Sequence, residues 1–171
     1  MSRKGESVPL KEAIQQVEVA VSRLALMHLS FSKTMVDELG EKKGKDLIIK
    51  SVAEYGRRVG ERAKQGFQDL PKYGVTEKNE DGRAYNCVLG RIFQEYGEED
   101  LGCLYCYVDA AKSMAVDPGR KLIHKTSIAC GDDHCTFEWV STTEKEREDF
   151  NRKASDWKYV DPRLVEGSGL D

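Results

Sequence analysis

Four of the five cysteines form two pairs along the chain, Cys103-x2-Cys106 and Cys130-x4-Cys135. Zinc binds four thiolates in a tetrahedron, and a Cys-x2-Cys pair can place two ligands on one ion. These four residues are therefore candidate ligands of a metal, and zinc is the metal that they would suit. The second pair has four intervening residues rather than two, however, and two other interpretations stay open.

The first alternative is a reactive thiol. The sequence predicts a helix over residues 104–116, and a thiol at a helix N-terminus has a lowered pKa because the exposed N–H groups favour the anion. Cys103 and Cys106 occupy about that position. Asp109 follows Cys106 by three residues, so both project from one helix face, and a carboxylate there can act as a base. The second alternative is simple burial, since cysteine is among the most often buried residues.

The predicted second helix, residues 45–67, contains an unusual run of glycines and arginines at residues 55–60. Each glycine costs about 1 kcal/mol relative to alanine inside a helix, which favours close approach of another helix at this point. Arg57 or Arg58 is a candidate cation for a bound carboxylate, because the guanidinium fork matches that group. His28 lies in the apolar stripe of the first helix and is expected to be a histidine at the edge of the core with a local partner.

Hydrophobic periodicity gives the elements that must position these groups. Residues 9–39 repeat apolar side chains at steps of three and four, the period of one helix face. Residues 83–97 predict a short helix, and residues 120–140 alternate as a β-hairpin with turn residues at 131–133. The strand face is expected to run from Leu122 on to Cys130. The predicted fold class is α+β, with long N-terminal helices packed on a small antiparallel sheet that contains the hairpin.

The length of 171 residues suits a single domain over residues 1–171. Within it we expect a helical part at 8–70 and an α+β part at 83–141 that carries the cysteine cluster. The end of the chain, residues 160–171, is expected to be a frayed tail.

The composition limits the classes of molecule that the protein is expected to bind. The net charge is −3, whereas nucleic-acid binding usually calls for a basic face. No apolar run resembles a secretory signal or a membrane span, and an odd number of cysteines without such a signal favours reduced thiols and a cytoplasmic location. A small-molecule substrate or ligand is the expected partner. The first helix is also a candidate surface for self-association into a homo-oligomer.

Three segments carry a family resemblance. The first is Tyr-Gly-Arg-Arg-Val-Gly at residues 55–60. The second is Gly-Cys-Leu-Tyr-Cys-Tyr-Val-Asp at residues 102–109, and the third is Gly-Asp-Asp-His-Cys-Thr-Phe at residues 131–137. In order and spacing, over about residues 35–140, they resemble the L-2-amino-thiazoline-4-carboxylic acid hydrolase family. The resemblance implies a hydrolase that opens a cyclic amidine-thioether ring to an N-carbamoyl-cysteine-type product. The positions that match the family pattern are Cys106, Asp109, Gly131, Asp132 and Cys135.

The resemblance also implies roles for residues. Asp109 would activate water, or Cys106 would attack as the nucleophile, with Cys135 beside them. His134 or His124 would carry the proton, because histidine titrates nearest neutrality. The substrate would be held by Arg57 or Arg58, which would bind its carboxylate, and by Asp132.

The Gly-Asp-x-x-Cys-x-Phe ending is similar to that of the 4-vinyl reductase domain, a small-molecule-binding module. In that module an upstream glutamate and cysteine serve a metal, and the matching positions here hold His124 and Ser127. The alternative function is therefore a non-catalytic small-molecule-binding or sensor domain, with zinc as an optional component. A zinc-stabilised interaction protein is the third interpretation.

Overall fold

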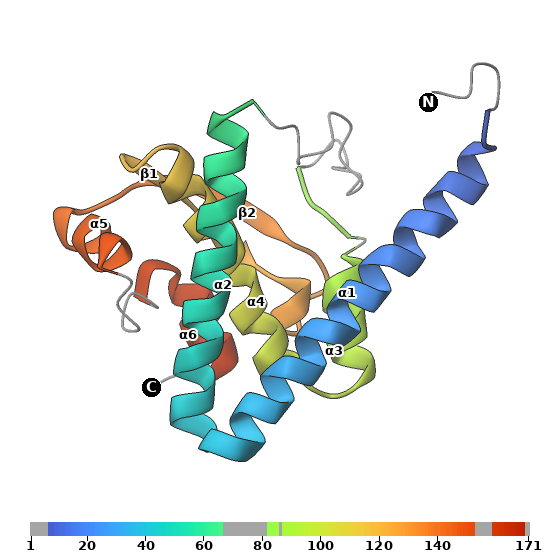
Figure 1. The fold of residues 1–171 in the computed structure, drawn as a ribbon, viewed down its shortest axis with the longest axis horizontal. Coiled ribbons are helices and arrows are strands. Elements are labelled where there is room, and N and C mark those ends of the chain that lie inside the picture. Colours follow the sequence, from blue (N-terminus) through green and yellow to red (C-terminus); the bar gives the residue numbers. More distant parts are fainter. Residues whose placement is uncertain (1–6, 67–81, 86, 153–158, 170–171) are drawn as a thin grey trace.

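The computed structural model describes residues 7–66, 82–85, 87–152 and 159–169 (Figure 1). Within these ranges, helices dominate and β1 and β2 form a small antiparallel sheet, so the α+β prediction is confirmed. The elements, in chain order, are α1 (Leu10–Leu39), α2 (Glu41–Lys64), α3 (Val88–Glu95), α4 (Glu99–Val116), β1 (Arg120–Thr126), the 3-10 turn η1 (Ile128–Cys130), β2 (Thr136–Ser141), α5 (Glu144–Asn151) and α6 (Pro162–Ser168).

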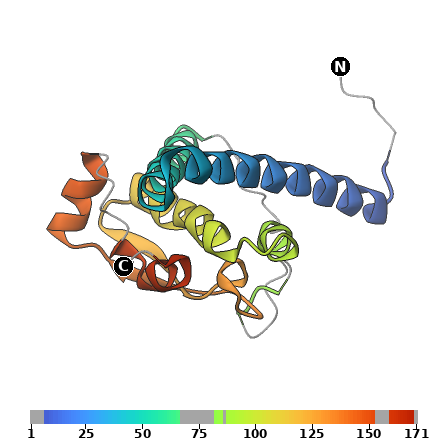
Figure 2. The same cartoon turned by 90° about the horizontal axis from the view of Figure 1, so that it is seen from below.

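Helix α4 lies at the centre of the fold. Figure 2 shows it, in yellow, between the α1–α2 pair on one side and the β1–β2 hairpin with α6 on the other. Leu104, Tyr107 and Ala110 of this helix have no exposed surface. A helix that is covered on several sides is apolar on several faces, and α4 therefore carries buried residues around most of its circumference.

The two long helices predicted from periodicity are present. They form a helical hairpin that turns at Gly40, where the φ of 77° suits glycine. The second helix begins at Glu41 and ends at Lys64; residues 67–70 of the predicted helical part lie outside the described residues. The buried residues of α1 all lie in its C-terminal half, and its N-terminal half extends beyond the body of the protein (Figure 2). Among the described helices, none combines the length and apolar character needed to cross a bilayer.

The glycines of α2 let it approach α4 closely, as the sequence predicts. A Cβ added to Gly56 would lie 2.6 Å from Cβ of Ala111, and one added to Gly60 would lie 2.6 Å from Cβ of Ala115. Both distances are too short for two carbon atoms that are not bonded to each other. The contact between the helices therefore requires glycine on α2 opposite alanine on α4.

The helix that carries the first cysteine pair starts earlier than predicted. It begins at Glu99 rather than at residue 104. Two acidic residues occupy its first turn, where the positive end of the helix dipole stabilises their negative charge. Cys103 and Cys106 consequently lie inside α4. The prediction that they sit at a helix N-terminus is wrong.

The predicted hairpin is present but shorter than expected. β1 and β2 are antiparallel, with His124 opposite Phe137. The prediction that the strand face continues to Cys130 is wrong: β1 ends at Thr126, and η1 follows. The turn closes at Gly131, whose φ is 90°, a conformation that L side chains rarely adopt.

The predicted frayed tail is wrong for residues 160–169. α6 starts with a proline in its first turn and ends at Gly169, whose φ is 62°, the asymmetry expected of a helix with defined ends. Val160, Asp161, Leu164 and Ser168 have no exposed surface. The helix packs on α4. The segment 160–168 is thus packed into the core.

Substitution of Gly56 by alanine is expected to destabilise the protein. Overpacking costs about 1–3 kcal/mol, which exceeds the gain of about 1 kcal/mol that alanine brings to a helix interior. Denaturant unfolding should therefore show a lower midpoint for Gly56→Ala. The double variant Gly56→Ala/Ala111→Gly should recover part of the loss, because it removes the nearest of the atoms that the new Cβ meets, whereas two backbone atoms of α4 at 2.9 Å remain. Equal midpoints for Gly56→Ala and the parent protein would contradict this account of the contact.

Candidate functional site

A histidine between two carboxylates forms the polar centre of the molecule. Nδ1 of His124 lies 2.9 Å from Oδ2 of Asp161, and the backbone N–H of His124 donates to the same oxygen at 3.0 Å. On the other side of the ring, Nε2 lies 3.6 Å from Oδ2 of Asp109. The side chains of Asp161 and His124 are 0% and 2% exposed, whereas that of Asp109 is 25% exposed. The three groups thus run from the core to the surface.

Three elements bring these groups together. His124 comes from β1, Asp109 from α4, and Asp161 is the residue immediately before α6. Oδ1 of Asp161 is buried and has no hydrogen-bond partner among the described residues. Because a buried carboxylate is stabilised by the donors around it, the two N–H groups of His124 are the main described support of this one.

The arrangement also fixes the orientation of the imidazole. An ionised carboxylate accepts hydrogen bonds but cannot donate them. Asp161 therefore favours the tautomer of His124 with the proton on Nδ1. Nε2 then carries a lone pair that faces Asp109. A histidine held in this way by a buried carboxylate has the orientation that a general base needs.

Lys112 stands next to Asp109 on α4. Its Nζ donates to Oδ1 of Asp109 at 2.9 Å, and its side chain is 24% exposed. The partly exposed end of the site therefore presents one carboxylate and one ammonium group side by side. Lys112 was not among the residues that the sequence motifs singled out, because its spacing from Asp109 matches an ordinary ion pair on a helix surface.

The thiols of Cys106 and Cys135 are buried close to this centre. Burial raises the pKa of Cys106 well above its usual value, and a hydrogen bond with Ser127, 3.5 Å from Sγ to Oγ, opposes the shift only in part. Burial also raises the pKa of Cys135 to about 11, although its Sγ accepts the N–H of Ile128 at 3.3 Å. Both side chains are therefore neutral thiols at neutral pH. The predicted lowering of the Cys106 pKa by a helix N-terminus is wrong.

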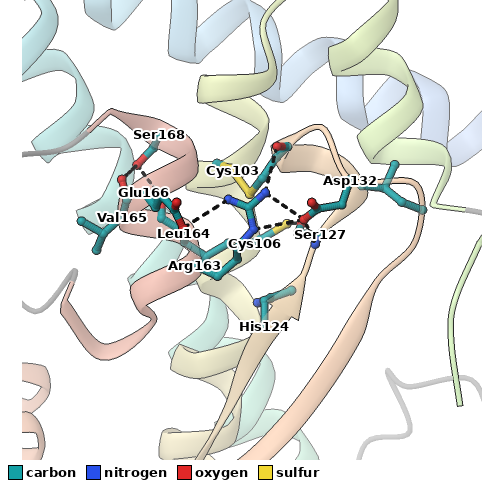
Figure 3. Close-up of a disulfide and its surroundings, with 12 residues drawn as sticks. Cys103, Cys106, His124, Ser127, Asp132, Arg163, Leu164, Val165, Glu166 and Ser168 are labelled. Atoms are coloured by element: carbon teal, nitrogen blue, oxygen red, sulfur yellow. Dashed lines mark hydrogen bonds and ion pairs between the residues drawn. A yellow bond between two sulfur atoms is a disulfide. The ribbon is translucent and has the colours of Figure 1, made fainter.

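Cys103 and Cys130 are joined in a disulfide that ties α4 to η1 (Figure 3). The prediction that all thiols are reduced is wrong for this pair, and the bond also removes two of the four candidate zinc ligands. Among the residues that the structure describes, no three His, Cys, Asp or Glu side chains are placed to hold a metal ion. The metal site of the 4-vinyl reductase domain is not reproduced either, because the positions of its glutamate and cysteine hold His124 and Ser127.

Asp132 stabilises the turn that carries Ser127. Its Oδ2 accepts the backbone N–H of Ser127 at 2.7 Å and the Nε and Nη2 of Arg163 at 3.0 and 2.8 Å. Figure 3 shows Arg163 reaching from α6 toward Asp132. The same guanidinium donates to the carbonyl of Cys130 at 3.3 Å. The structure thus places the predicted substrate-binding residue Asp132 in a contact between η1 and α6.

The remaining predicted site residues make their contacts elsewhere. Arg57 donates to Glu54 at 2.7 Å and to the carbonyl of Phe150 at 2.8 Å, and Arg58 also pairs with Glu54. His134 pairs with the neighbouring residue Asp133. These contacts do not join the arginines or His134 to the centre formed by Asp109 and His124.

The sequence did not indicate Asp161 as part of the site. Asp161 and His124 are 37 positions apart, and the aspartate lies in a segment that was expected to be frayed. An Asp-Pro step is a helix start signal, so Asp161-Pro162 could have predicted α6. The hydrogen bonds to His124 depend on the tertiary fold and have no local signal.

Comparison with known proteins identifies one family. The profile of the family described as L-2-amino-thiazoline-4-carboxylic acid hydrolase matches residues 20–139. The matched region contains Cys106, Asp109 and His124, whereas Asp161 lies beyond it. No curated protein and no solved structure matches the chain.

The burial of the thiols predicts their reactivity. In the native, unreduced protein at neutral pH, iodoacetamide should label Cys106 and Cys135 slowly, because the thiolate is the nucleophile and burial raises the pKa of each. Labelling of Cys135 should speed up as the pH rises toward about 11. Peptide mass mapping measures each site. Cys103 and Cys130 should react only after reduction, and rapid native labelling of Cys106 would contradict its burial as a neutral thiol.

Proposed function

The chain belongs to the L-2-amino-thiazoline-4-carboxylic acid hydrolase family, and on that premise we propose that it hydrolyses a cyclic amidine at the centre formed by Asp109 and His124. The observation that carries the proposal is the position of His124, held at Nδ1 by Asp161 and facing Asp109 with Nε2. The proposed substrate is L-2-amino-thiazoline-4-carboxylate or a close analogue.

The amidine explains the need for Asp109. An amidine is basic, and its protonated form carries N–H donors in a planar fork, which a carboxylate can accept in the way that it accepts a guanidinium. Asp109 is the member of the centre that solvent reaches most easily. Its neighbour Lys112 offers an ammonium group for the carboxylate of the substrate. This assignment replaces Arg57 and Arg58, whose contacts are with Glu54 and Phe150.

His124 would act as the general base. Nε2 takes a proton from water, and the water oxygen bonds to the ring carbon that joins nitrogen and sulfur. The bond from that carbon to sulfur then breaks, and the sulfur leaves with the proton that His124 has taken up. The C=N electron pair moves to the ring nitrogen, which already carries its proton in the protonated amidine, and the hydroxyl proton leaves to solvent as the former amidine carbon becomes a carbonyl. One molecule of water is consumed, and the product is an N-carbamoyl-cysteine with a free thiol.

The separation of 3.6 Å between Nε2 of His124 and Oδ2 of Asp109 is compatible with this role. It is too long for a strong direct hydrogen bond, so Nε2 is not saturated by the carboxylate. Catalytic hydrogen bonds are often long in a free enzyme and shorten when substrate binds. A water or a substrate N–H can bridge the two groups.

In this mechanism the free thiols are not nucleophiles. Cys106 would need to lose a proton that burial holds firmly, and the same is true of Cys135. Their contacts with Ser127 and Ile128 instead support the wall of the site next to η1. The proposal therefore favours direct attack by water over a covalent enzyme intermediate.

The deep burial of His124 favours one rival, a non-catalytic small-molecule-binding domain. If solvent and substrate do not reach Nε2, a ligand at Asp109 would raise thermal stability without being converted. Incubation with L-2-amino-thiazoline-4-carboxylate distinguishes the two functions: a thiol product that thiol reagents detect supports the hydrolase, while a thermal shift without product supports the binding domain.

Substitution of Asp109 by asparagine should lower kcat/KM for the aminothiazoline carboxylate by roughly 100-fold or more, the usual contribution of an acid–base or charge-matching group. Asparagine keeps the shape of the side chain and removes the charge. The matched control is Cys106→Ala, which removes a neighbouring buried thiol and should change kcat/KM only a few-fold. Circular dichroism verifies that both variants fold. Comparable losses in the two variants would instead favour a thiol mechanism.

A further inference from the structure

A small pocket lies between α1 and α2, with α4 as its floor. Its volume is about 180 Å³. α1 contributes His28 and Phe31, α2 contributes Ser51 and Tyr55, and the floor is Tyr105 of α4. Much of the remaining lining is aliphatic, and none of the lining residues is charged at neutral pH. The proposed catalytic groups are not part of this pocket.

Aromatic rings form much of the wall. The His28 and Tyr105 rings meet edge to face with their centroids 4.9 Å apart, and the Tyr55 and Tyr105 centroids are 6.5 Å apart. Phe31 is exposed over 60% of its surface although it lines the pocket. Aromatic faces and edges arranged in this way attract another ring, because offset and edge-to-face contacts between rings are favourable.

The polar atoms in the pocket suit an uncharged guest. Burial lowers the pKa of His28 to about 4, so the imidazole is neutral at physiological pH, and its Nε2 lies 3.4 Å from the hydroxyl of Ser32. The prediction of a histidine at the core edge with a local partner is thereby confirmed. A carboxylate guest would be desolvated here without a cation to pair with it, and transfer of an unpaired charge into such a site is costly.

The volume limits the guest to one ring. A dry apolar cavity of about 150 Å³ is known to hold one benzene molecule, and the present pocket, which is open to solvent on one side, is only slightly larger. A fused two-ring molecule would extend into solvent. A single ring with one small polar substituent is the size of guest that suits this volume.

The pocket is adjacent to the proposed reaction centre. Tyr105 precedes Asp109 by one turn of α4, and residues spaced by four on a helix have Cβ atoms about 5–6 Å apart. Both side chains are only partly buried. A molecule whose ring occupies the pocket can therefore extend along α4 to Asp109.

We propose that this pocket binds an uncharged, single-ring aromatic group, and that the substrate of this chain carries such a group in addition to its reacting amidine. The second half of the proposal rests on the hydrolase function, whereas binding of the ring does not. L-2-amino-thiazoline-4-carboxylate itself would leave the pocket empty. The natural substrate is then a larger relative of that compound, with an aromatic substituent.

Three probes of equal size test the binding: benzyl alcohol, benzoate and benzylammonium share one ring and differ in charge. Titration calorimetry or ligand-detected NMR with the full chain measures each affinity. Benzyl alcohol should bind at least about tenfold more tightly than either ion, a difference of about 1.4 kcal/mol. Equal or tighter binding of benzylammonium would overturn the proposal in favour of a cation-binding aromatic cage, and absence of benzyl alcohol binding would overturn it altogether.

A pocket-filling variant locates the probe. Ser51 is exposed on α2 and lines the pocket. The Phe side chain in Ser51→Phe should therefore occupy the space without disturbing the core, and it should weaken the binding of benzyl alcohol by about tenfold or more. Lys50→Phe places the same ring one residue away, at an exposed position outside the lining, and should bind as the parent does. Unfolding midpoints verify that both variants fold.

Unchanged binding in Ser51→Phe would place the probe elsewhere and refute the site. These outcomes are independent of turnover, so a protein that binds benzyl alcohol but does not hydrolyse the aminothiazoline carboxylate contradicts the proposed reaction and leaves the pocket assignment standing.

Discussion

The close contact between α2 and α4 determines where the other elements can lie. Gly56 and Gly60 allow the α4 backbone to approach α2 until alanine side chains touch the α2 surface. Once this side of α4 is covered, its opposite side is available to the hairpin and to α6. The stripe between these two covered sides includes Tyr105, Asp109 and Lys112, which stay partly exposed. The charged side chains of Asp109 and Lys112 lie on that stripe because it is the part of the helix that packing leaves open.

Electrostatics links this stripe to the core. Asp161 has no exposed surface, so its carboxylate depends on the N–H groups that β1 supplies through His124. The same contact orients the imidazole toward Asp109. One pair of contacts thus serves two purposes: it supports one oxygen of a buried carboxylate at the start of α6, and it favours the tautomer of His124 with the proton on Nδ1. Lys121, the other buried polar residue of β1, is satisfied from the same region of the chain, by Glu146 and the carbonyl of Val160, each at 2.5 Å.

Local sequence signals predicted the parts of the fold that depend on local physics. The periodicity of residues 9–39 and 45–67 predicted α1 and α2, and the cost of glycine inside a helix predicted the close approach at Gly56. Alternation and turn residues predicted the hairpin. The relation between Asp161 and His124 could not be predicted in this way, because neither position carries a local sign of the other. The four-thiolate hypothesis failed for a related reason: spacing places Cys103 and Cys106 on one helix, but the tertiary fold joins Cys103 to Cys130 and leaves Cys106 beside Ser127.

The arginines of the sequence motif and the lysine that we propose to bind the substrate carboxylate differ in their contacts. Arg57 and Arg58 belong to a motif that resembles the family, yet their guanidinium groups pair with Glu54, and Arg57 also stacks on the Phe150 ring at 4.4 Å. The motif around Gly56 therefore has a clear structural explanation in helix packing and in the attachment of α5. Lys112, which no motif indicated, lies beside Asp109.

The bond between Cys103 and Cys130 closes a loop across 27 positions of the chain. In the chain-entropy description, a loop of this length restricts the unfolded ensemble enough to favour the native state by ~3–4 kcal/mol. Domains are commonly stable by about 5–15 kcal/mol in total. Dithiol reductants would therefore remove a substantial fraction of the folding free energy, and the persistence of the native state would depend on the thiol–disulfide balance of the surroundings.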